Sequence, residues 1–189
     1  CIDGDTGWIV CGPLTAAETP RAALEFINEK LGKRPVVGVV YSHTHVDHWA
    51  GVRGVVDEAD VVSGKVMLIA PSGFMDHAIS ENVFAGTAMS RRTQWQYATL
   101  LQRNPHGHVD QAIGKNAANG SVGLIAPNHL ITKDIEEVTL DGVKMVFQDV
   151  SDTEAPVELN TYFPQFKALW SSVFDDAATT EIYTLRGAA

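Results

Sequence analysis

Apolar runs separated by turn residues predict a chain in which strands alternate with helices. The runs at residues 8–11, 65–70 and 121–126 each stop at a glycine or a proline, as short strands often do. The run at 36–41 is apolar at nearly every position, which is typical of a strand that is buried on both faces in the middle of a sheet.

The C-terminal half of the chain predicts further strands. Asp141-Gly142 lies between apolar runs at 138–140 and 143–150, and this pair of residues is a strong signal for a tight hairpin turn. Shorter strands are expected at 157–163, 168–174 and 182–185.

Two segments predict helices. Thr19 and Pro20 resemble an N-cap followed by proline at the first helical position, and Gly32 is expected to end that helix. Residues 76–101 predict a second helical segment, and the segment 102–120, rich in Gly, Asn and His, predicts a long loop. Strands that alternate with helices in this way indicate an α/β layered domain.

Composition narrows the class of protein. The 189 residues suffice for one domain with its own core, and 45% hydrophobic with 20% charged residues is typical of a globular domain. A net charge of −9 without any run of Lys or Arg argues against a nucleic-acid partner, and the apolar runs are too short to span a membrane. Cys1 and Cys11 form no C-x-x-C motif, and a disulfide between them stays open.

Four residues directly after the run at 36–41 carry the strongest chemical signal: His43, His45, Asp47 and His48. Imidazole nitrogens and carboxylate oxygens are good zinc donors. His43 and His45 are two positions apart, so at an extended strand end they point to the same side, while Asp47 and His48 follow as the chain turns. One loop can therefore serve two metal ions; the alternative is a polar turn that is merely rich in histidine.

The pattern H-x-H-x-D-H after a buried strand resembles the signature of the metallo-β-lactamase superfamily. Other runs resemble the alkyl sulfatase branch, the zinc enzymes that hydrolyse dodecyl sulfate and related linear alkyl sulfate esters to alcohol and sulfate. These runs begin at Gly51, Gly73, Glu81, Met89, Gly107, Ser151 and Tyr183. The resemblance implies a metallo-β-lactamase-like αββα sandwich and a sulfuric ester hydrolase.

The resemblance also implies a domain organisation. We expect residues 1–189 to form a metallo-β-lactamase-like catalytic domain that is partial, incomplete at its C-terminal end. The helical dimerisation region, through which the family forms homodimers, and the lipid-carrier-like C-terminal domain are expected to be absent. The family includes secreted, periplasmic and cytoplasmic members, so the compartment stays open.

The resemblance assigns roles to individual residues. His43 and His45 are implied to hold the first zinc, with Glu154 as the next ligand, in the run S-D-T-E-A-P-V-E. Asp47 and His48 are implied to lie toward a second zinc, and Asp47 also to orient the attacking water as a catalytic residue. The alternative for Glu154 is an ordinary solvated loop glutamate.

Arg186, in the run Y-T-L-R-G-A, is implied to bind the sulfate group. A guanidinium is planar, always charged and able to donate hydrogen bonds to two sulfate oxygens, although a surface arginine is the alternative.

Four other histidines are weaker ligand candidates: His77, His106, His108 and His129. Four aromatic residues either line an apolar slot for the alkyl chain or, as we expect more often of such residues, pack in the core: Trp49, Phe74, Trp95 and Tyr97.

The chain departs from the family pattern at several positions. Aligned without gaps from Arg186, the family's bridging glutamate falls on Val173, and two of its histidines fall on Ala177 and Thr180. Asp175 or Asp176 can substitute only after a shift of the chain, and the family's last metal histidine would lie beyond Ala189. The family binds two zinc ions, and these departures leave open whether this chain binds two, one or none.

A smaller departure lies in Val10-Cys11-Gly12-Pro13, where the family resembles V-I-D-P and a supporting carboxylate is expected to be missing.

Three hypotheses follow from the whole chain. The first is zinc-dependent hydrolysis of a small alkyl sulfate, the second a degenerate, non-catalytic module, and the third a thioester or phosphoester hydrolase of the same superfamily.

Overall fold

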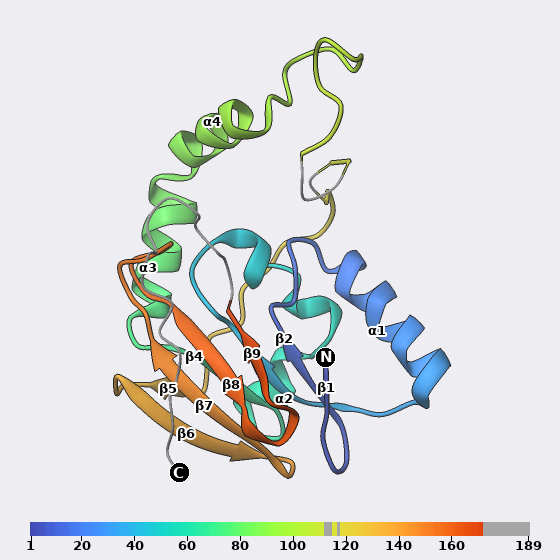
Figure 1. Ribbon diagram of the computed structural model, residues 1–189, viewed down its shortest axis with the longest axis vertical. Coiled ribbons are helices and arrows are strands. Elements are labelled where there is room, and N and C mark those ends of the chain that lie inside the picture. Colours follow the sequence, from blue (N-terminus) through green and yellow to red (C-terminus); the bar gives the residue numbers. More distant parts are fainter. Residues whose placement is uncertain (112–114, 117, 172–189) are drawn as a thin grey trace.

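Two β-sheets stacked face to face carry helices on one side in the computed structural model, which describes residues 1–111, 115–116 and 118–171 (Figure 1). The strands are β1 (Ile2–Asp3), β2 (Trp8–Cys11), β3 (Val36–Val40), β4 (Met67–Pro71), β5 (His129–Ile131), β6 (Ile135–Leu140), β7 (Val143–Asp149), β8 (Leu159–Phe163) and β9 (Ala168–Trp170). The helices are α1 (Glu18–Leu31), α2 (Glu58–Val62), α3 (Phe74–Ile79) and α4 (Gly86–Tyr97), with a π-helical turn η3 (Ser80–Phe84) and the 3-10 turns η1 (Val46–His48), η2 (Val52–Gly54) and η4 (Pro164–Phe166). Within the described residues, no helix is both long and apolar enough to cross a membrane.

β3 lies at the centre of the first sheet, whose strand order is β1-β2-β3-β4-β5. It pairs in parallel with β2 on one side and with β4 on the other, which confirms the prediction for the run at 36–41. Val39 packs toward the helices and Val40 toward the second sheet, so both faces of the strand are buried. The carboxyl end of β3 is therefore held by a neighbouring strand on each side and by packing on each face.

The second sheet has the strand order β6-β7-β8-β9 and is antiparallel throughout. Along β7 the buried side chains alternate with less buried ones, so Val143, Met145 and Phe147 face the first sheet. They pack with Leu159 and Phe163 of β8 into the core between the sheets. This core fixes the distance between β3 and β8, the two strands whose ends build the site.

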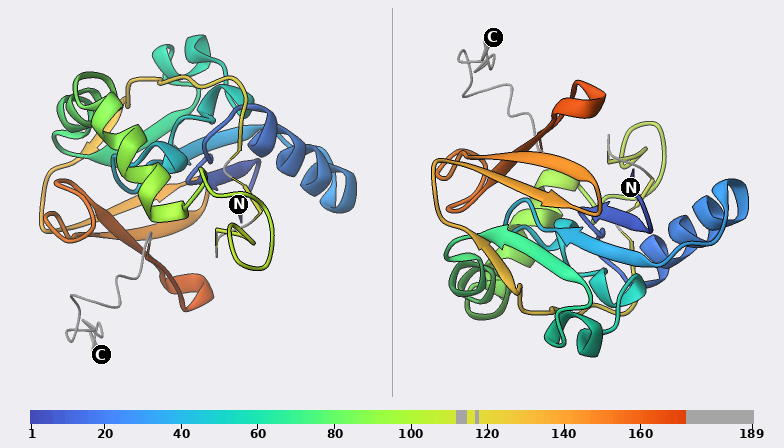
Figure 2. Two further views of the ribbon diagram at one scale, coloured as in Figure 1. Left: turned by 90° about the horizontal axis from the view of Figure 1, so that it is seen from above. Right: turned by 90° about the horizontal axis from the view of Figure 1, so that it is seen from below.

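The outer face of the first sheet packs on the helices. Val61 of α2 and Phe74 and Ala78 of α3 share a buried cluster with residues of β2, β3 and β4. Seen from above and below, the order of layers is helices, first sheet, second sheet (Figure 2). These layers confirm the predicted α/β class, and helices over the outer face of the second sheet, the fourth layer of the sandwich, are not found among residues 1–111 and 118–171.

Two local predictions were wrong in detail. Helix α1 begins at Glu18, with Ala17 rather than Thr19 at its N-cap, while its end at Gly32 is confirmed by a φ of 99°, which favours glycine. The predicted helix over 76–101 is divided into α3, the π-helical turn and α4. Figure 1 shows α4 and the segment after it extending away from the two sheets.

The predicted strand at 121–126 is absent, and the chain forms β5 further on, paired with β4. The backbone of 121–126 is committed to distant loops instead. The carbonyl of Ser121 accepts a hydrogen bond from the N–H of Ala17 at 2.9 Å, and the N–H of Gly123 donates to the carbonyl of Ala50 at 2.8 Å. These long-range partners outweigh the local preference for an extended strand.

The predicted hairpin at Asp141-Gly142 is confirmed, and its turn also ties the two sheets together. The two residues have φ of 49° and 78°, the left-handed values that a type I′ turn requires. The Asp141 carboxylate accepts hydrogen bonds from the N–H groups of Thr6 and Gly7 and from the Thr6 hydroxyl, each at 2.8 Å. Burial would raise the pKa of Asp141, but these hydrogen bonds and the charge of Arg34 hold it below its ordinary value.

Replacing Asp141 with alanine is expected to lower the free energy of unfolding by about 1–2 kcal/mol near neutral pH, because three donors lose a charged acceptor at a partly exposed site. Because the folded pKa is depressed, this contribution is present above the unfolded pKa and is lost as the pH falls through the folded pKa. Denaturant unfolding at about pH 7 and about pH 3 measures it. Asp141→Asn, which still suits the left-handed turn, is the control, and an alanine effect as large in acid as at neutral pH would contradict the assignment.

Candidate functional site

The loop after β3 connects the two sheets at the edge where the parallel strands end. The carbonyl of Ser42 accepts a hydrogen bond from the N–H of Leu159 at 2.9 Å, and His43 forms an isolated antiparallel bridge with Glu158. The 3-10 turn η1 follows at once and carries Asp47 and His48. The histidine motif is therefore held between β3 and the start of β8, at the strand ends where open α/β sheets bind ligands.

His43 is fully buried, which a histidine rarely is without a reason. Its Nδ1 lies 3.1 Å from the Ser42 hydroxyl oxygen, while its Nε2 is buried and has no hydrogen-bond partner among the described residues. Burial, together with the smaller effects of the neighbouring His48 and His45, lowers the pKa of His43 to about 3, and the charge of Asp47 opposes this shift only in part. The ring is therefore neutral, with one nitrogen available to a ligand.

His48 and Asp47 form a pair beside His43. The ring centroids of His43 and His48 are 4.1 Å apart, and His48 Nε2 lies 3.3 Å from Asp47 Oδ2. Burial would raise the pKa of Asp47, but the hydrogen bond and the charge of His48 hold it below its ordinary value. The half-exposed Asp47 is therefore ionised at neutral pH. A Cβ built on Gly12 would lie 3.8 Å from Nδ1 of His48, so position 12, where the family pattern implies a carboxylate and this chain has glycine, borders His48.

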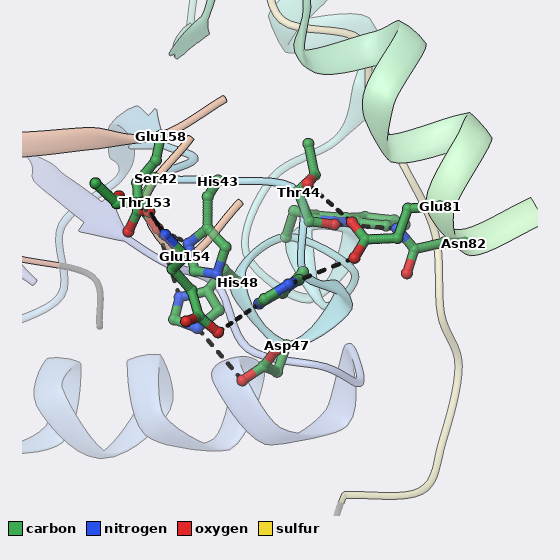
Figure 3. A network of polar contacts seen from close by, with 12 residues as sticks. Ser42, His43, Thr44, Asp47, His48, Glu81, Asn82, Thr153, Glu154 and Glu158 are labelled. Atoms are coloured by element: carbon green, nitrogen blue, oxygen red, sulfur yellow. Dashed lines mark hydrogen bonds and ion pairs between the residues drawn. The ribbon is translucent and has the colours of Figure 1, made fainter. Parts of the chain in front are cut away.

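His45 lies between the carboxylates of Glu81 and Glu154, both of which Figure 3 labels. Its Nδ1 is 3.4 Å from Glu154 Oε1, and its Nε2 is 3.4 Å from Glu81 Oε1. Its ring packs edge-on against His43, with centroids 4.6 Å apart. The structure therefore places Glu154, far along the chain, next to the motif.

The Glu154 loop is held by Glu158. One oxygen of the Glu158 carboxylate accepts hydrogen bonds from the Thr153 hydroxyl at 2.8 Å and from the N–H of Glu154 at 3.1 Å. Glu158 itself is buried, with 2% of its surface exposed. Glu158 thus contacts both parts of the site: its carboxylate holds the backbone of Glu154, and its backbone bridges to His43.

The donor set suits a metal ion, because imidazole nitrogens and carboxylates are what zinc prefers. A buried polar atom without a partner, such as Nε2 of His43, points to a ligand that satisfies it. In the part of the chain that the structure describes, no three His, Cys, Asp or Glu side chains converge on one point. The predicted ligands lie together as pairs, His45 with Glu154 and His48 with Asp47.

A comparison with protein families agrees with this geometry. The model of a family described as the metallo-beta-lactamase superfamily matches residues 1–147 of the 189. The chain belongs to this superfamily. Membership implies metal ions, in agreement with the donor set around His43.

Relatives within the superfamily are alkylsulfatases. The chain is 48% identical to an (R)-specific secondary-alkylsulfatase of Pseudomonas sp over 99% of its own length and 28% of the relative's. It is 44% identical to the alkyl/aryl-sulfatase BDS1 of Saccharomyces cerevisiae, over 98% of the chain and 29% of the relative. The solved structure of the inverting sec-alkylsulfatase Pisa1 from Pseudomonas sp. matches with a TM-score of 0.83 and 49% identity, over 89% of this chain and 27% of that one. The chain spans less than a third of the length of these relatives.

The weaker ligand candidates of this member of the metallo-beta-lactamase superfamily are dispersed. His77 and His106 are exposed, His129 is on β5, and His108 is buried in the segment after α4. None of these four is paired with the motif by a hydrogen bond or ion pair that the structure shows. They stay outside the cluster around His43.

The four aromatic candidates fall into three classes. Trp49 and Phe74 pack in the core as expected, whereas Trp95 is 89% exposed and packs in none. Tyr97 is partly buried, and this burial, followed by the negative charges of Asp47 and Glu154, raises the pKa of its phenol. Tyr97 is thus the aromatic residue whose electrostatics are coupled to the cluster.

Several predicted residues lie outside the described residues: Val173, Asp175, Asp176, Ala177, Thr180 and Arg186. Their assigned roles stay predictions. Sequence reasoning did not single out Glu81 and Glu158 for the site. Both stand in family-like runs, and that was the one signal from which their place could have been inferred.

The buried His43 predicts a pH dependence of stability in chain freed of metal by a chelator. The unfolded chain binds a proton near the ordinary histidine pKa, but the folded chain does not until about pH 3, so stability falls as the pH falls. Between about pH 7 and about pH 5 the His43 contribution is about 2 kcal/mol. Denaturant unfolding of wild type and His43→Gln measures it as the difference between their pH dependences.

A direct reading comes from the ring signals of His43 in a nuclear magnetic resonance titration. They should not move down to about pH 4. Movement with an ordinary histidine midpoint, together with equal pH dependences of the two proteins, would contradict the burial argument.

Proposed function

We propose that this chain forms the metal-binding part of an enzyme that hydrolyses alkyl sulfate esters to an alcohol and sulfate, with zinc as its cofactor. The observation that carries the proposal is the buried Nε2 of His43, which has no partner among the described residues and lies in a cluster of other zinc-type donors. Similarity to alkylsulfatases over nearly the whole chain supports the substrate class.

Each residue of the cluster has a task in this proposal. His43 through Nε2, His45 through Nδ1 and Glu154 would hold one zinc, while Asp47 and His48 would serve a second. Zinc, when bound, supplies a Lewis acid that makes hydroxide available near neutral pH. Burial keeps His43 neutral, so that its lone pair is free to bind. Asp47, ionised at neutral pH, accepts a hydrogen bond from the attacking water and orients it.

The reaction adds one water to one ester. We propose that the water oxygen bonds to the ester carbon while the carbon–oxygen bond breaks, and the electron pair leaves with sulfate. The proton of the water passes to Asp47 and then to solvent. A solved relative is described as inverting, and inversion at a carbon requires attack at that carbon. Arg186 is proposed to hold the sulfate oxygens as charge develops on them.

Two other functions remain as outcomes of the test. A non-catalytic module would keep the fold and bind metal without turnover, and the positions Val173 and Ala177 favour it because neither side chain can ligate zinc. A thioester or phosphoester hydrolase would use the same cluster on another ester. The similarity to alkylsulfatases counts against that second alternative.

His43→Ala and Glu154→Gln are expected to lower zinc affinity and sulfate release by more than about 100-fold, because each removes a direct ligand and even supporting residues cost 10–100-fold. Zinc is measured by equilibrium dialysis with elemental analysis, and sulfate is measured with a secondary alkyl sulfate and with dodecyl sulfate. His106→Ala, an exposed histidine outside the cluster, is the matched control and should change neither.

The same assay in water labelled with heavy oxygen separates the routes. Attack at carbon puts the label in the alcohol, and attack at sulfur puts it in the sulfate. Zinc binding without turnover of any ester would favour the non-catalytic module. Turnover of thioesters or phosphoesters instead of sulfate esters would establish the third hypothesis.

A further inference from the structure

A π-helical turn lies against the histidine motif. The turn η3 (Ser80–Phe84) interrupts the helical segment between α3 and α4. Such turns are rare in proteins, but those that occur often lie at functional sites. Its residues Glu81 and Asn82 both reach the motif at Thr44 (Figure 3). A segment that is not part of the motif therefore holds it in place.

The two contacts to Thr44 differ in kind. Asn82 Nδ2 donates to the backbone carbonyl of Thr44 at 3.0 Å, and the same nitrogen donates to the carbonyl of Ala78 at 3.0 Å. This contact fixes the backbone of the loop. Glu81 Oε2 instead accepts a hydrogen bond from the Thr44 hydroxyl at 2.9 Å, which fixes the direction of the carboxylate.

The second oxygen of Glu81 faces His45. Glu81 Oε1 lies 3.4 Å from His45 Nε2, while Glu154 Oε1 lies 3.4 Å from His45 Nδ1. A neutral imidazole has one N–H and one lone pair, and a carboxylate can only accept. Each ring nitrogen of His45 faces a carboxylate, but the single N–H of the neutral ring can donate a hydrogen bond to only one of the two.

The surroundings of the two carboxylates decide which of them accepts the hydrogen bond from the ring N–H of His45. Glu81 is mostly buried, with 18% of its side chain exposed, and its other oxygen is already fixed by Thr44. Glu154 is more exposed, at 27%, and lies on the side of the ring where the other donors gather. The oriented and less solvated carboxylate is the better permanent acceptor.

We propose that Glu81 is a positioning residue that holds the proton of His45 on Nε2, so that the Nδ1 lone pair faces Glu154 and a bound metal. The inference rests on the proposed function for its metal but concerns a residue outside the ligand set. The carboxylate orients the imidazole as supporting carboxylates do for metal-bound histidines. Without it, the proton can move to Nδ1 and block that nitrogen.

The first test reads the tautomer of His45 directly in chain freed of metal. Long-range proton–nitrogen correlation spectra at about pH 8, where an ordinary histidine is neutral, distinguish an Nε2–H ring from an Nδ1–H ring. Wild type is expected to show Nε2–H at His45, and Glu81→Gln, whose amide can donate to Nε2, is expected to show more Nδ1–H. His45→Asn identifies the signal by its loss.

The second test measures zinc affinity by competition with a coloured chelator. Glu81→Gln and Glu81→Ala are expected to weaken zinc binding by about 10–100-fold, the usual effect of losing a supporting residue. Glu58→Gln, which changes an exposed carboxylate paired with Arg53 away from the site, should leave affinity within about twofold. Asn82→Ala removes the backbone contact alone and should leave the tautomer as in wild type.

The outcomes separate this inference from the proposed function. An Nδ1–H ring in wild type, or an unchanged Nε2–H ring in Glu81→Gln with zinc affinity within about twofold, would overturn the role of Glu81. A tautomer shift equally large in Asn82→Ala would also overturn it, because the turn would then act only as a structural support. Failure of wild type to bind zinc or release sulfate would overturn the proposed function, while the tautomer measurement would still decide the place of the proton.

Discussion

The hydrogen-bonded connection between the end of β3 and the start of β8 is the constraint on which the site depends. β3 is buried on both faces, and its last residues pass directly into a loop whose backbone pairs with Leu159 and Glu158 of the other sheet. The core between the sheets sets the spacing of these two strands. The position of His43 is therefore determined by the packing of the whole sandwich and not by the loop alone.

The same connection brings several imidazole and carboxylate side chains close together. The rings of His45 and His48 each contact the ring of His43, which is fully buried and neutral. Carboxylates approach this group from separate segments: Asp47 from the motif, Glu154 from the loop before β8, and Glu81 from the π-helical turn. The excess of carboxylates around this group suits a cation of high charge, because it neutralises the ion where it binds.

Sequence reasoning predicted the parts of this arrangement that local patterns encode. The apolar run that became β3, the hairpin at Asp141-Gly142 and the metal-type spacing of the motif are all readable from neighbouring residues. The irregular backbone at 121–126 was not predictable, because its partners Ala17 and Ala50 are far away in sequence. A helical period in the sequence does not reveal the one-turn widening that brings Glu81 to His45.

Glu158 shows a second limit of prediction from sequence. A buried glutamate looks like any exposed one in a sequence, and only the hydrogen bonds that its carboxylate accepts from Thr153 and Glu154 reveal that Glu158 supports this loop. The structure brings Glu154, which the alkyl sulfatase resemblance singled out as a ligand, to 3.4 Å from His45, although no local pattern links two residues so far apart; its role as a ligand stays a prediction. The roles assigned to Val173, Ala177 and Arg186 stay predictions.

The central claim is that the free nitrogen of His43 is a metal ligand, held ready by the two sheets. Anomalous diffraction at the zinc absorption edge, from crystals of the chain grown with zinc, tests it most directly. We predict a peak about 2 Å from His43 Nε2, with His45 Nδ1 and Glu154 as its neighbours. Zinc bound elsewhere, with His43 Nε2 still without a ligand, would contradict the account.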